Sequence, residues 1–233
     1  IRRQRQMCIR DRPTVSYRGR IAPTPSGPLH LGHARTFYQA YLRSRVAGGS
    51  LVFRMEDLDQ ARSRPLYAER ALLELGELGI VWEEGPDVGG PYEPYNQSER
   101  ISHYLEAWKN LQTSGSIYPC RLSRKDVEGA LLAPHGPDGE AIFPLSLRAP
   151  ADTPLTGVDP GAVNWRFAVP YGETISFTDL NCGPQTFVCG EDLGDFLVWR
   201  KDGYPSYELA VVVDDAQMKI TEVVRGRDLL LST

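Results

Sequence analysis

Residues 17–33 read Y-R-G-R-I-A-P-T-P-S-G-P-L-H-L-G-H, and this stretch changes character twice. Its segment 19–22 is typical of a short strand, and the proline and glycine residues of 23–28 form a turn. From His30 the apolar residues recur at helical spacing until the glycine pair at 48–49 ends the pattern. A strand, a tight turn and a helix in this order predict the opening unit of a parallel α/β sheet.

Further elements follow in the same alternating order. Residues 51–55 form a short apolar run typical of a buried strand. Pro65 begins a second predicted helix that ends at Gly79, and Ser98 begins a third that ends at Gly115. The residues predicted to share the buried faces are Leu31, Ala34, Tyr38, Tyr41 and Leu42 in the first helix, Leu66, Leu72, Leu75 and Leu78 in the second, and Ile101, Tyr104, Leu105, Trp108 and Leu111 in the third.

The chain changes texture after Tyr118. Residues 119–159 are rich in proline, glycine and short apolar runs, which indicates an inserted subdomain or irregular loops. Apolar alternation at 165–169 and 175–177 predicts antiparallel strands. Three further apolar runs are expected to be strands that return to the main sheet: 196–199, 209–213 and 220–224.

Composition limits the class of protein. The chain has 233 residues, 41% hydrophobic and 24% charged, as in folded soluble proteins. No apolar run approaches the roughly 20 residues that span a bilayer, so we expect no membrane partner. Four cysteines without paired spacing predict a reducing, cytoplasmic location. Residues 1–12 hold five arginines and one aspartate and show no apolar period, so we expect residues 1–16 to be a disordered or foreign tail.

His30, Gly32 and His33 begin the first predicted helix directly after the turn. A helix amino terminus presents free N–H groups and a partial positive charge, which suit a polyphosphate. Two imidazoles on the first helical turn can donate hydrogen bonds to phosphate oxygens, and Gly32 leaves room for a flat base. The competing interpretation is that the histidines only cap the helix. Their position after a strand and a turn favours a functional site.

Arg54, Glu56, Asp57 and Asp59 follow the second predicted strand, where ligand sites of open α/β sheets lie. Glu56 could pair with a substrate ammonium group. Taken alone, the segment is better explained as a solvated acidic turn in which Arg54 is a local ion-pair partner.

Tyr207 and Arg225 flank the last apolar runs. A tyrosine hydroxyl before a buried run can reach into a cleft, and Arg225 can hold a carboxylate by a two-pronged hydrogen bond. The competing interpretation is a core strand, a surface turn and an ordinary ion pair, and it is strongest for Asp214.

These motifs together resemble class I aminoacyl-tRNA synthetases of the glutamyl/glutaminyl branch. The resemblance runs from about Tyr17 to the end of the chain. It implies an α/β fold, with a Rossmann-like catalytic domain and an inserted α+β subdomain. H-x-G-H alone occurs in other nucleotidyl transferases, so a general enzyme of that kind is a competing interpretation. The motifs that carry the resemblance are G-R-I-A-P-T-P-S-G-P-L-H-L-G-H at 19–33, F-R-M-E-D-L-D at 53–59, Y-E-L-A-V-V-V-D-D at 207–215 and V-V-R-G-R-D-L-L at 223–230.

The resemblance implies an ATP-dependent ligase that joins L-glutamate to ATP and passes the glutamyl group to tRNA. It implies that Glu56 takes the α-ammonium group and that Tyr207 and Arg225 hold carboxylates. Catalysis would lie with His30 and His33, which handle the ATP phosphates together with Mg²⁺, while Gly32 lies beside the adenine. The glutamate pocket so implied consists of Arg20, Ile21, Ala22, Pro23, Thr24, Glu56, Tyr207 and Arg225.

Within this branch two kinds of enzyme compete. Glutamyl-tRNA synthetase charges tRNA(Glu), and the shorter glutamyl-Q tRNA(Asp) synthetase attaches glutamate to queuosine in the anticodon of tRNA(Asp). P-S-G-P-L-H-L-G at 25–32 and the end of the chain are more similar to the shorter enzyme. A third possibility is a non-catalytic synthetase-like binding protein. Arg121, Arg124 and Lys125 are candidate tRNA phosphate contacts, although a solvated helix face explains them better. A monomer is expected.

The resemblance also divides the chain. Residues 1–16 would be the tail, 17–115 the first half of the catalytic domain, 116–165 the inserted subdomain, and 166–233 an incomplete second half. The family's second ATP motif, rich in lysine, would follow Thr233, so we expect a chain truncated at the C-terminus and of low activity.

The family often carries a zinc site after the third helix. Here Cys120 stands at the first ligand position, but Leu122, Phe143 and Leu147 stand where the others would be. One thiol cannot make a tetrahedral structural zinc site. We therefore expect Cys120 to be a lone remnant within a small hydrophobic core.

Purified protein should accordingly contain no stoichiometric zinc, because three of the four ligand positions carry side chains that cannot bind the ion. Elemental analysis of metal per chain tests this expectation, and a ratio near one zinc per chain would contradict it.

Overall fold

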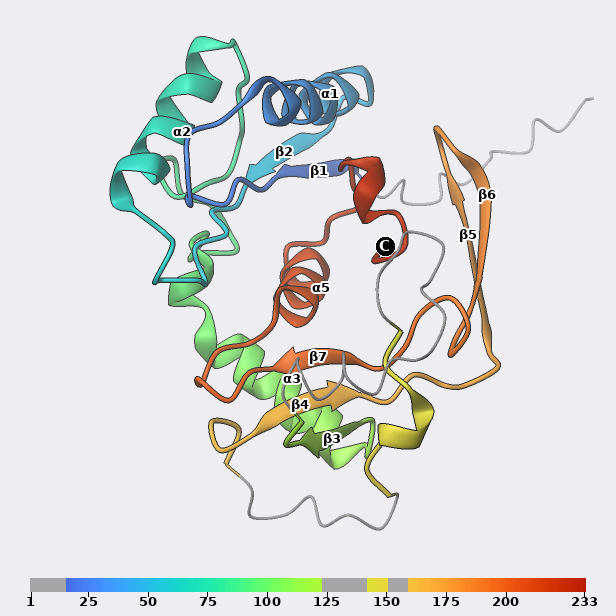
Figure 1. The fold of residues 1–233 in the computed structure, drawn as a ribbon. Coiled ribbons are helices and arrows are strands. Elements are labelled where there is room, and N and C mark those ends of the chain that lie inside the picture. The colour runs from blue at the N-terminus through green and yellow to red at the C-terminus, as the bar shows by residue number, and fades with distance from the viewer. Residues whose placement is uncertain (1–15, 123–141, 151–158) are drawn as a thin grey trace, which may run out of the picture.

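The computed structural model describes residues 16–122, 142–150 and 159–233. The predicted tail up to residue 15, together with Arg124 and Lys125, lies outside the described residues. Figure 1 shows two layered halves, one above and one below the helix α5 (Tyr207–Gln217). Among the helices of these ranges, none has the length and apolar character needed to cross a membrane.

The upper half is the predicted strand–turn–helix unit and its continuation. Strands β1 (Arg18–Ile21) and β2 (Ser50–Phe53) pair in parallel, with Arg20 opposite Val52, and helix α1 (Leu31–Val46) connects them. Helix α2 (Pro65–Glu77) follows, and the proline at its first position has the fixed φ that a helix start needs. The core between these elements contains the fully buried Leu51, Phe53 and Leu75, each of which contributes about 1.5–3 kcal/mol by burial.

The buried face of α1 differs from the predicted one. Ala40 and Ser44 are its buried residues, and Phe37 and Tyr41 pack partly against the core. The predicted Leu31 and Leu42 are 86% and 44% exposed, as is Tyr38 at 43%. Small side chains at 40 and 44 let the helix lie close to the two strands, so the face is chosen by fit rather than by the number of large apolar residues.

The buried face of α2 was predicted only in part. Leu75 is buried and Leu72 packs against the core, whereas Leu66 and Leu78 are exposed. Ala71, which the pattern did not single out, is the other buried residue of this helix.

The lower half is an antiparallel sheet packed on a helix. Helix α3 (Ile101–Thr113) follows a short 3₁₀ turn (Gln97–Glu99) and buries Tyr104 and Trp108, as predicted. The rings of Trp108 and Trp165 meet edge to face with 4.9 Å between centroids. The sheet of this half has the order β3 (Ile117–Cys120), β4 (Asn164–Phe167) and β7 (Phe196–Trp199).

A separate hairpin projects from the lower half. Strands β5 (Thr174–Asp179) and β6 (Gly183–Val188) pair antiparallel (Figure 1). β5 confirms the strand predicted at 175–177, whereas the alternation did not predict β6. Two further 3₁₀ turns, Leu145–Leu147 and Arg227–Leu229, complete the described elements.

None of the three strands predicted to return to the main sheet pairs with β1 or β2. One of the three is a strand of another sheet, and the other two are not strands. Residues 196–199 are a strand, but they pair with β4 rather than with β1 or β2. Residues 209–213 belong to helix α5. Ser206 caps the amino end of this helix, because its hydroxyl oxygen accepts the N–H of Leu209 at 3.3 Å. The apolar run of this helix is continuous although Val212 is 65% exposed, and periodicity cannot distinguish such a run from a strand. Residues 220–224 form no strand, although the N–H of Thr221 donates to the carbonyl of Arg18 in β1.

Asp214 of α5 joins the two halves. This carboxylate has no exposed surface and accepts hydrogen bonds from Gln97 Nε2 at 2.8 Å, Arg100 Nε at 2.7 Å and the hydroxyl of Tyr104 at 2.9 Å. Arg54 Nε, at the end of β2, lies 3.6 Å from its Oδ2. We call these five residues the Asp214 cluster. Burial and the neighbouring Asp214 raise the pKa of Tyr104, so its hydroxyl stays protonated as a donor.

The hydrophobic core predicted around Cys120 is confirmed. Cys120 is buried with Tyr118 and Phe143, and Leu122 and Leu147 pack against them. Asp195 lies beside this core, where it accepts the Tyr118 hydroxyl at 2.7 Å and pairs with Arg148. The segment 142–150 is thus attached by apolar packing and one ion pair.

Replacing Asp214 by alanine should lower the free energy of unfolding by about 3–5 kcal/mol, because it leaves two buried arginines without their shared carboxylate. Urea unfolding followed by tryptophan fluorescence measures this change. Asp202→Asn is the control, since it breaks the exposed pair with Arg200 and should cost less than about 1 kcal/mol. Equal losses in the two variants would contradict the assignment.

Candidate functional site

The carboxyl ends of β1 and β2 form the base of the site. The N–H of Arg54 donates to the carbonyl of Ile21 at 2.9 Å, and the N–H of Glu56 donates to the carbonyl of Pro23 at 3.0 Å. The parallel pairing therefore continues past the strands and fixes the backbone of 54–56 against the turn. Side chains that leave these strand ends meet where open α/β sheets hold ligands.

Arg20, Arg54, Glu56 and Asp215 are brought together at this base. Arg54 Nη2 donates to Glu56 Oε1 at 3.1 Å, and Arg54 Nη1 donates to Asp215 Oδ1 at 2.5 Å. Arg20 Nε lies 3.6 Å from Asp215 Oδ2, and its Nη1 donates to the carbonyl of Val224 at 3.1 Å. We call these four residues the pocket network. Its carboxylates come from β2 and α5, which are far apart in the sequence.

Burial and charge oppose each other within the network. Burial lowers the pKa of Arg20, and Asp215 acts against that change. Burial raises the pKa of Glu56, while Arg54 and Arg20 favour its ionised form. With Arg54 in direct contact, Glu56 is a carboxylate whose remaining lone pairs can accept from a ligand.

Tyr207 and Arg225 are the two side chains predicted to hold carboxylates. Tyr207 is the first residue of α5, and burial, followed by the charge of Glu56, raises the pKa of its hydroxyl. Arg225 and Arg20 oppose that change in the pKa of the hydroxyl. Arg225 Nε and Nη2 donate to the hydroxyl of Thr233 at 2.9 and 2.6 Å. A guanidinium edge that binds a single oxygen with two N–H groups can bind a carboxylate by the same edge.

The four predicted pocket residues at 21–24 differ in how exposed their side chains are. The side chain of Ile21 is fully buried in the core, and Pro23 is buried as well. Ala22 is half-buried and Thr24 is exposed. Prediction placed all four in the pocket, but alternation along β1 turns Ile21 away from Arg20.

The structure confirms that the histidine pair caps the helix, and phosphate binding by the pair stays a prediction. His30 caps α1, because its Nδ1 accepts the N–H of Gly32 at 3.1 Å, and His33 Nδ1 faces the N–H of His30 at 3.4 Å. The two rings stack with 3.8 Å between centroids. Since both Nδ1 atoms accept, each neutral ring carries its proton on Nε2, which remains a donor. The histidines therefore cap the helix and still offer donors to an anion.

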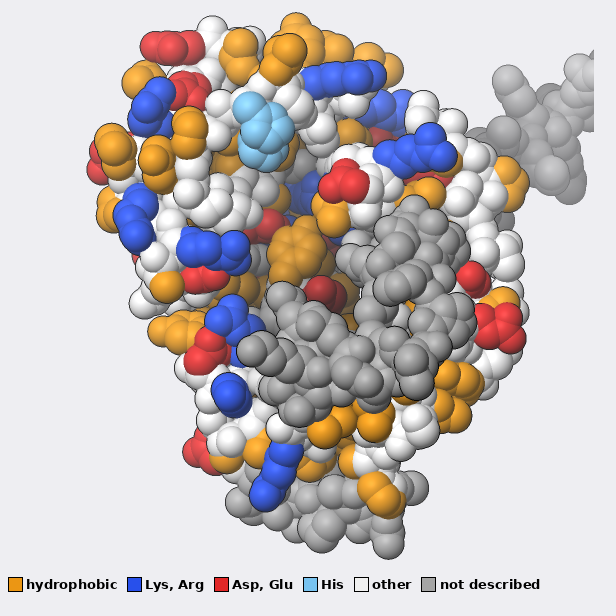
Figure 2. Space-filling model, in the orientation of Figure 1, with side chains coloured by type: hydrophobic (Ala, Val, Ile, Leu, Met, Phe, Trp, Pro, Cys, Tyr) orange, Lys and Arg blue, Asp and Glu red, His pale blue; other side chains and the backbone are white. Residues whose placement is uncertain are grey.

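The structure gives a second reason for glycine at position 32, besides the predicted access for a base. A Cβ added at this position would lie 2.9 Å from Cε1 of His30, closer than side-chain contacts allow. Figure 2 shows histidine side chains at the rim of a hollow whose floor contains acidic and apolar side chains. Glycine at 32 allows the His30 ring to fold back over the first turn of the helix.

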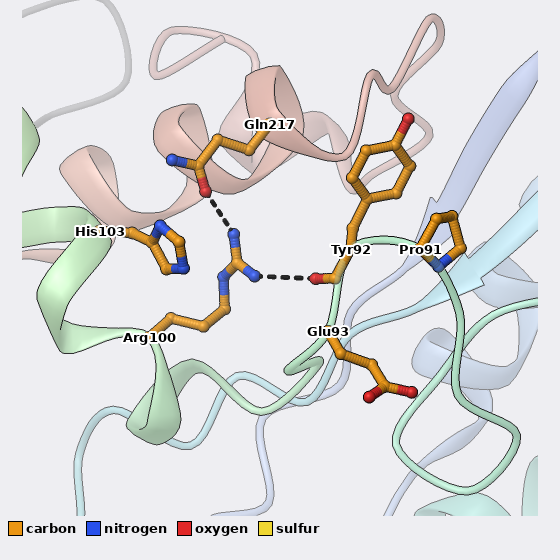
Figure 3. A pocket seen from close by; sticks show the side chains of 6 residues that line it. All are labelled: Pro91, Tyr92, Glu93, Arg100, His103 and Gln217. Carbon is orange, nitrogen blue, oxygen red and sulfur yellow. Dashed lines mark hydrogen bonds between the residues drawn. The ribbon is translucent and has the colours of Figure 1, made fainter.

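A pocket of about 260 Å³ lies beside Arg100, a member of the Asp214 cluster (Figure 3). Arg100 donates there to the carbonyl of Tyr92 at 3.0 Å and to Gln217 Oε1 at 2.6 Å, besides its bond to Asp214. None of the predicted site residues lines it. The residues that line it are Pro91, Tyr92, Glu93, Arg100, His103 and Gln217. Because four of the five guanidinium N–H groups already bind protein atoms, we assign this arginine to the fold.

Sequence reasoning missed the roles of Arg54, Asp214 and Asp215. Arg54 was interpreted as a local ion-pair partner, and it does bind Glu56, but it also reaches α5. The signal in the sequence was the pair of adjacent acids directly after an apolar run. A buried aspartate requires a cation or hydrogen-bond donors from another segment of the chain. Within the described ranges, no group of three or more potential metal ligands of the His, Cys, Asp and Glu types is close enough to hold an ion. The expectation of no zinc stays a prediction.

His33 should titrate below the ordinary histidine pKa of about 6.5, since burial and the neighbouring His30 both lower its pKa. The contact of His33 Nδ1 with the N–H of His30 then contributes its full stability above about pH 6.5 and loses it as the pH falls through the lowered pKa, because a protonated His33 ring no longer accepts at Nδ1. NMR titration of the ring protons measures this, with His30→Ala expected to raise the pKa of His33. A midpoint above 6.5 in the unsubstituted protein would contradict the arrangement.

Comparison with known proteins gives a family and close relatives. The catalytic-domain model of the class I tRNA synthetases (E and Q) matches residues 16–233. A glutamyl-Q tRNA(Asp) synthetase from Symbiobacterium thermophilum is 51% identical over 92% of this chain and 67% of its own length. A glutamate–tRNA ligase from Acidithiobacillus ferrooxidans is 42% identical over 94% of this chain and 46% of its own.

Solved structures agree with this relationship. A glutamate tRNA ligase from Elizabethkingia meningosepticum, crystallised with its amino acid, superposes with a TM-score of 0.79 at 30% identity, over 93% of this chain and 45% of that one. The predicted Rossmann-like α/β class is confirmed by this match. The chain therefore belongs to the class I tRNA synthetases of the E and Q type, a family of ligases.

Proposed function

We propose that this protein activates L-glutamate with ATP and transfers the glutamyl group to tRNA, specifically to queuosine of tRNA(Asp). The observation that carries the amino-acid part is the set of contacts that holds Arg20, Arg54, Glu56 and Asp215 together at the carboxyl ends of the parallel strands. We infer that Tyr207, the first residue of α5, and Arg225 face these groups. One anionic and two cationic side chains around a hydroxyl group match a ligand with one ammonium and two carboxylate groups.

The charges around the site support the same ligand. Each of three arginines contacts an acid at or below the base of the site, and Arg225 adds a cation that binds a neutral hydroxyl. A cation whose contacts among the described residues include no acid can bind a carboxylate of glutamate. The contacts join Arg20, Arg54 and Arg100 to Glu56, Asp214 and Asp215.

The start of α1 suits the ATP phosphates. His30 and His33 offer Nε2 donors at a helix amino terminus, where the helix dipole also favours an anion. ATP would bind there as its magnesium complex, with the metal neutralising phosphate charge. In the reaction, an oxygen of the glutamate α-carboxylate forms a bond to the α-phosphorus, and the bond to pyrophosphate breaks. Catalysis then rests on positioning and on stabilising charge at the phosphates.

The choice of tRNA rests on similarity alone. Two glutamyl-Q tRNA(Asp) synthetases are 51% and 44% identical to this chain, against 42% and 37% for two glutamate–tRNA ligases. Charging of tRNA(Glu) is the second candidate function. A binding protein without catalysis is less consistent with the assembled pocket, since mere RNA binding does not require Arg20, Glu56 and Asp215 to be held together.

Exchange of pyrophosphate into ATP should depend on L-glutamate in the protein at its natural length. L-Aspartate lacks one methylene and L-glutamine lacks the second carboxylate, so both should support much less exchange. Exchange without tRNA would support the queuosine-modifying enzyme, and exchange that requires tRNA would support charging of tRNA(Glu). Failure of glutamate to bind or to drive exchange under either condition would overturn the proposed function.

A further inference from the structure

The two ends of the amino-acid pocket carry opposite charges that are not paired with each other. Arg20 and Glu56 are both buried at neighbouring strand ends. Among the described residues, the ion pair of Arg20 is with Asp215 and that of Glu56 is with Arg54. Two opposite buried charges attract strongly in a medium of low dielectric constant, so something must keep them apart if both are to bind a ligand.

The groups between them alternate in sign. From Glu56 the contacts run to Arg54 at 3.1 Å, then to Asp215 at 2.5 Å, and then to Arg20 at 3.6 Å. Each pocket residue thus contacts an intermediate of opposite charge. The last contact is longer than a hydrogen bond, and Arg20 Nε has no hydrogen-bond partner within the described structure. Arg20 is therefore held to Asp215 by charge rather than by a hydrogen bond.

Asp215 is fixed in place by its neighbour. Asp214 holds α5 against Gln97, Arg100 and Tyr104, so the helix cannot rotate without breaking buried hydrogen bonds. The next residue, 100° further around the helix, then faces the two pocket arginines. The adjacent acids have different duties, because one holds the helix to the lower half and the other faces the strand ends.

We propose that Arg54 and Asp215 are positioning residues that separate Arg20 from Glu56 and so hold open the anion-binding and cation-binding ends of the amino-acid pocket. This inference rests on the proposed function, because it concerns the same pocket. Without the Asp215 charge, Arg54 would keep Glu56 and Asp214, but Arg20 would lose its ion-pair partner and turn toward Glu56. The pocket would close on an internal ion pair, and glutamate would have to break that pair to bind.

Asp215→Asn tests the proposal because it keeps the size of the side chain and removes its charge. L-Glutamate binding, measured by calorimetry, should weaken by roughly 10-fold or more, and the KM for glutamate in exchange should rise in parallel. The KM for ATP should stay within about twofold, since the start of α1 is untouched. Glu74→Gln is the matched control, because it removes the acid of an exposed Arg–Glu pair on α2 and should leave both values unchanged.

Asp215→Glu supplies the rescue. It keeps a negative charge near both arginines at a displaced position, so its affinity for L-glutamate should lie between those of Asp215→Asn and the unsubstituted protein. If Asp215→Asn does not fold, Asp215→Glu alone must raise the KM for glutamate several-fold while the KM for ATP stays unchanged.

Three results would overturn the proposal. The first is unchanged glutamate affinity in a folded Asp215→Asn protein, and the second is a loss of active protein with both KM values unchanged. The third is unfolding of both variants, which would assign Asp215 to the fold rather than to the pocket. A failure of the proposed function is a separate result, because the unsubstituted protein would then bind no L-glutamate at all.

Discussion

The buried carboxylate of Asp214 is the interaction on which the arrangement of this protein depends. It has no exposed surface, and its partners come from the end of β2, the segment before α3 and α3 itself. A buried carboxylate is tolerated only when hydrogen bonds and opposite charges surround it, so these segments must assemble together. The parallel and antiparallel halves are thereby brought to one helix, and the pocket forms where that helix meets the strand ends.

The site follows from this constraint rather than from any single motif. Arg54 contacts both adjacent acids of α5, so the same guanidinium contributes to the fold and to the pocket network. Glu56 and Arg20 then keep opposite charges at neighbouring strand ends because Arg54 and Asp215 lie between them. The start of α1 is independent of this network. Its histidines are organised by hydrogen bonds within one helical turn, which suits a phosphate site that works on a different part of the reaction.

Apolar packing and an adjacent ion pair hold the region around Cys120 together. Cys120 lies among Tyr118, Phe143 and Leu147, and the Asp195–Arg148 pair lies beside them. Apolar packing is less directional than metal coordination, but it needs no deprotonated ligands. Tyr118 links the apolar core to the ion pair, because its ring packs in the core and its hydroxyl donates to Asp195. Burial, together with Asp195, raises the pKa of that hydroxyl.

The sequence by itself determined the strand–turn–helix unit, the family resemblance and the chemical type of each pocket residue. These features depend on local spacing, since a turn rich in proline and glycine and a histidine pair at a helix start are set by neighbours along the chain. The tertiary structure decided which side chains reach the pocket, because Ile21 turns into the core while Arg54, Asp214 and Asp215 enter the charged networks. It also decided that 209–213 is a helix and that β7 pairs with β4. The run at 209–213 is apolar even at the exposed Val212, so its sequence shows no period. The partners of Asp214 lie more than a hundred residues away, so only the folded chain could specify either feature.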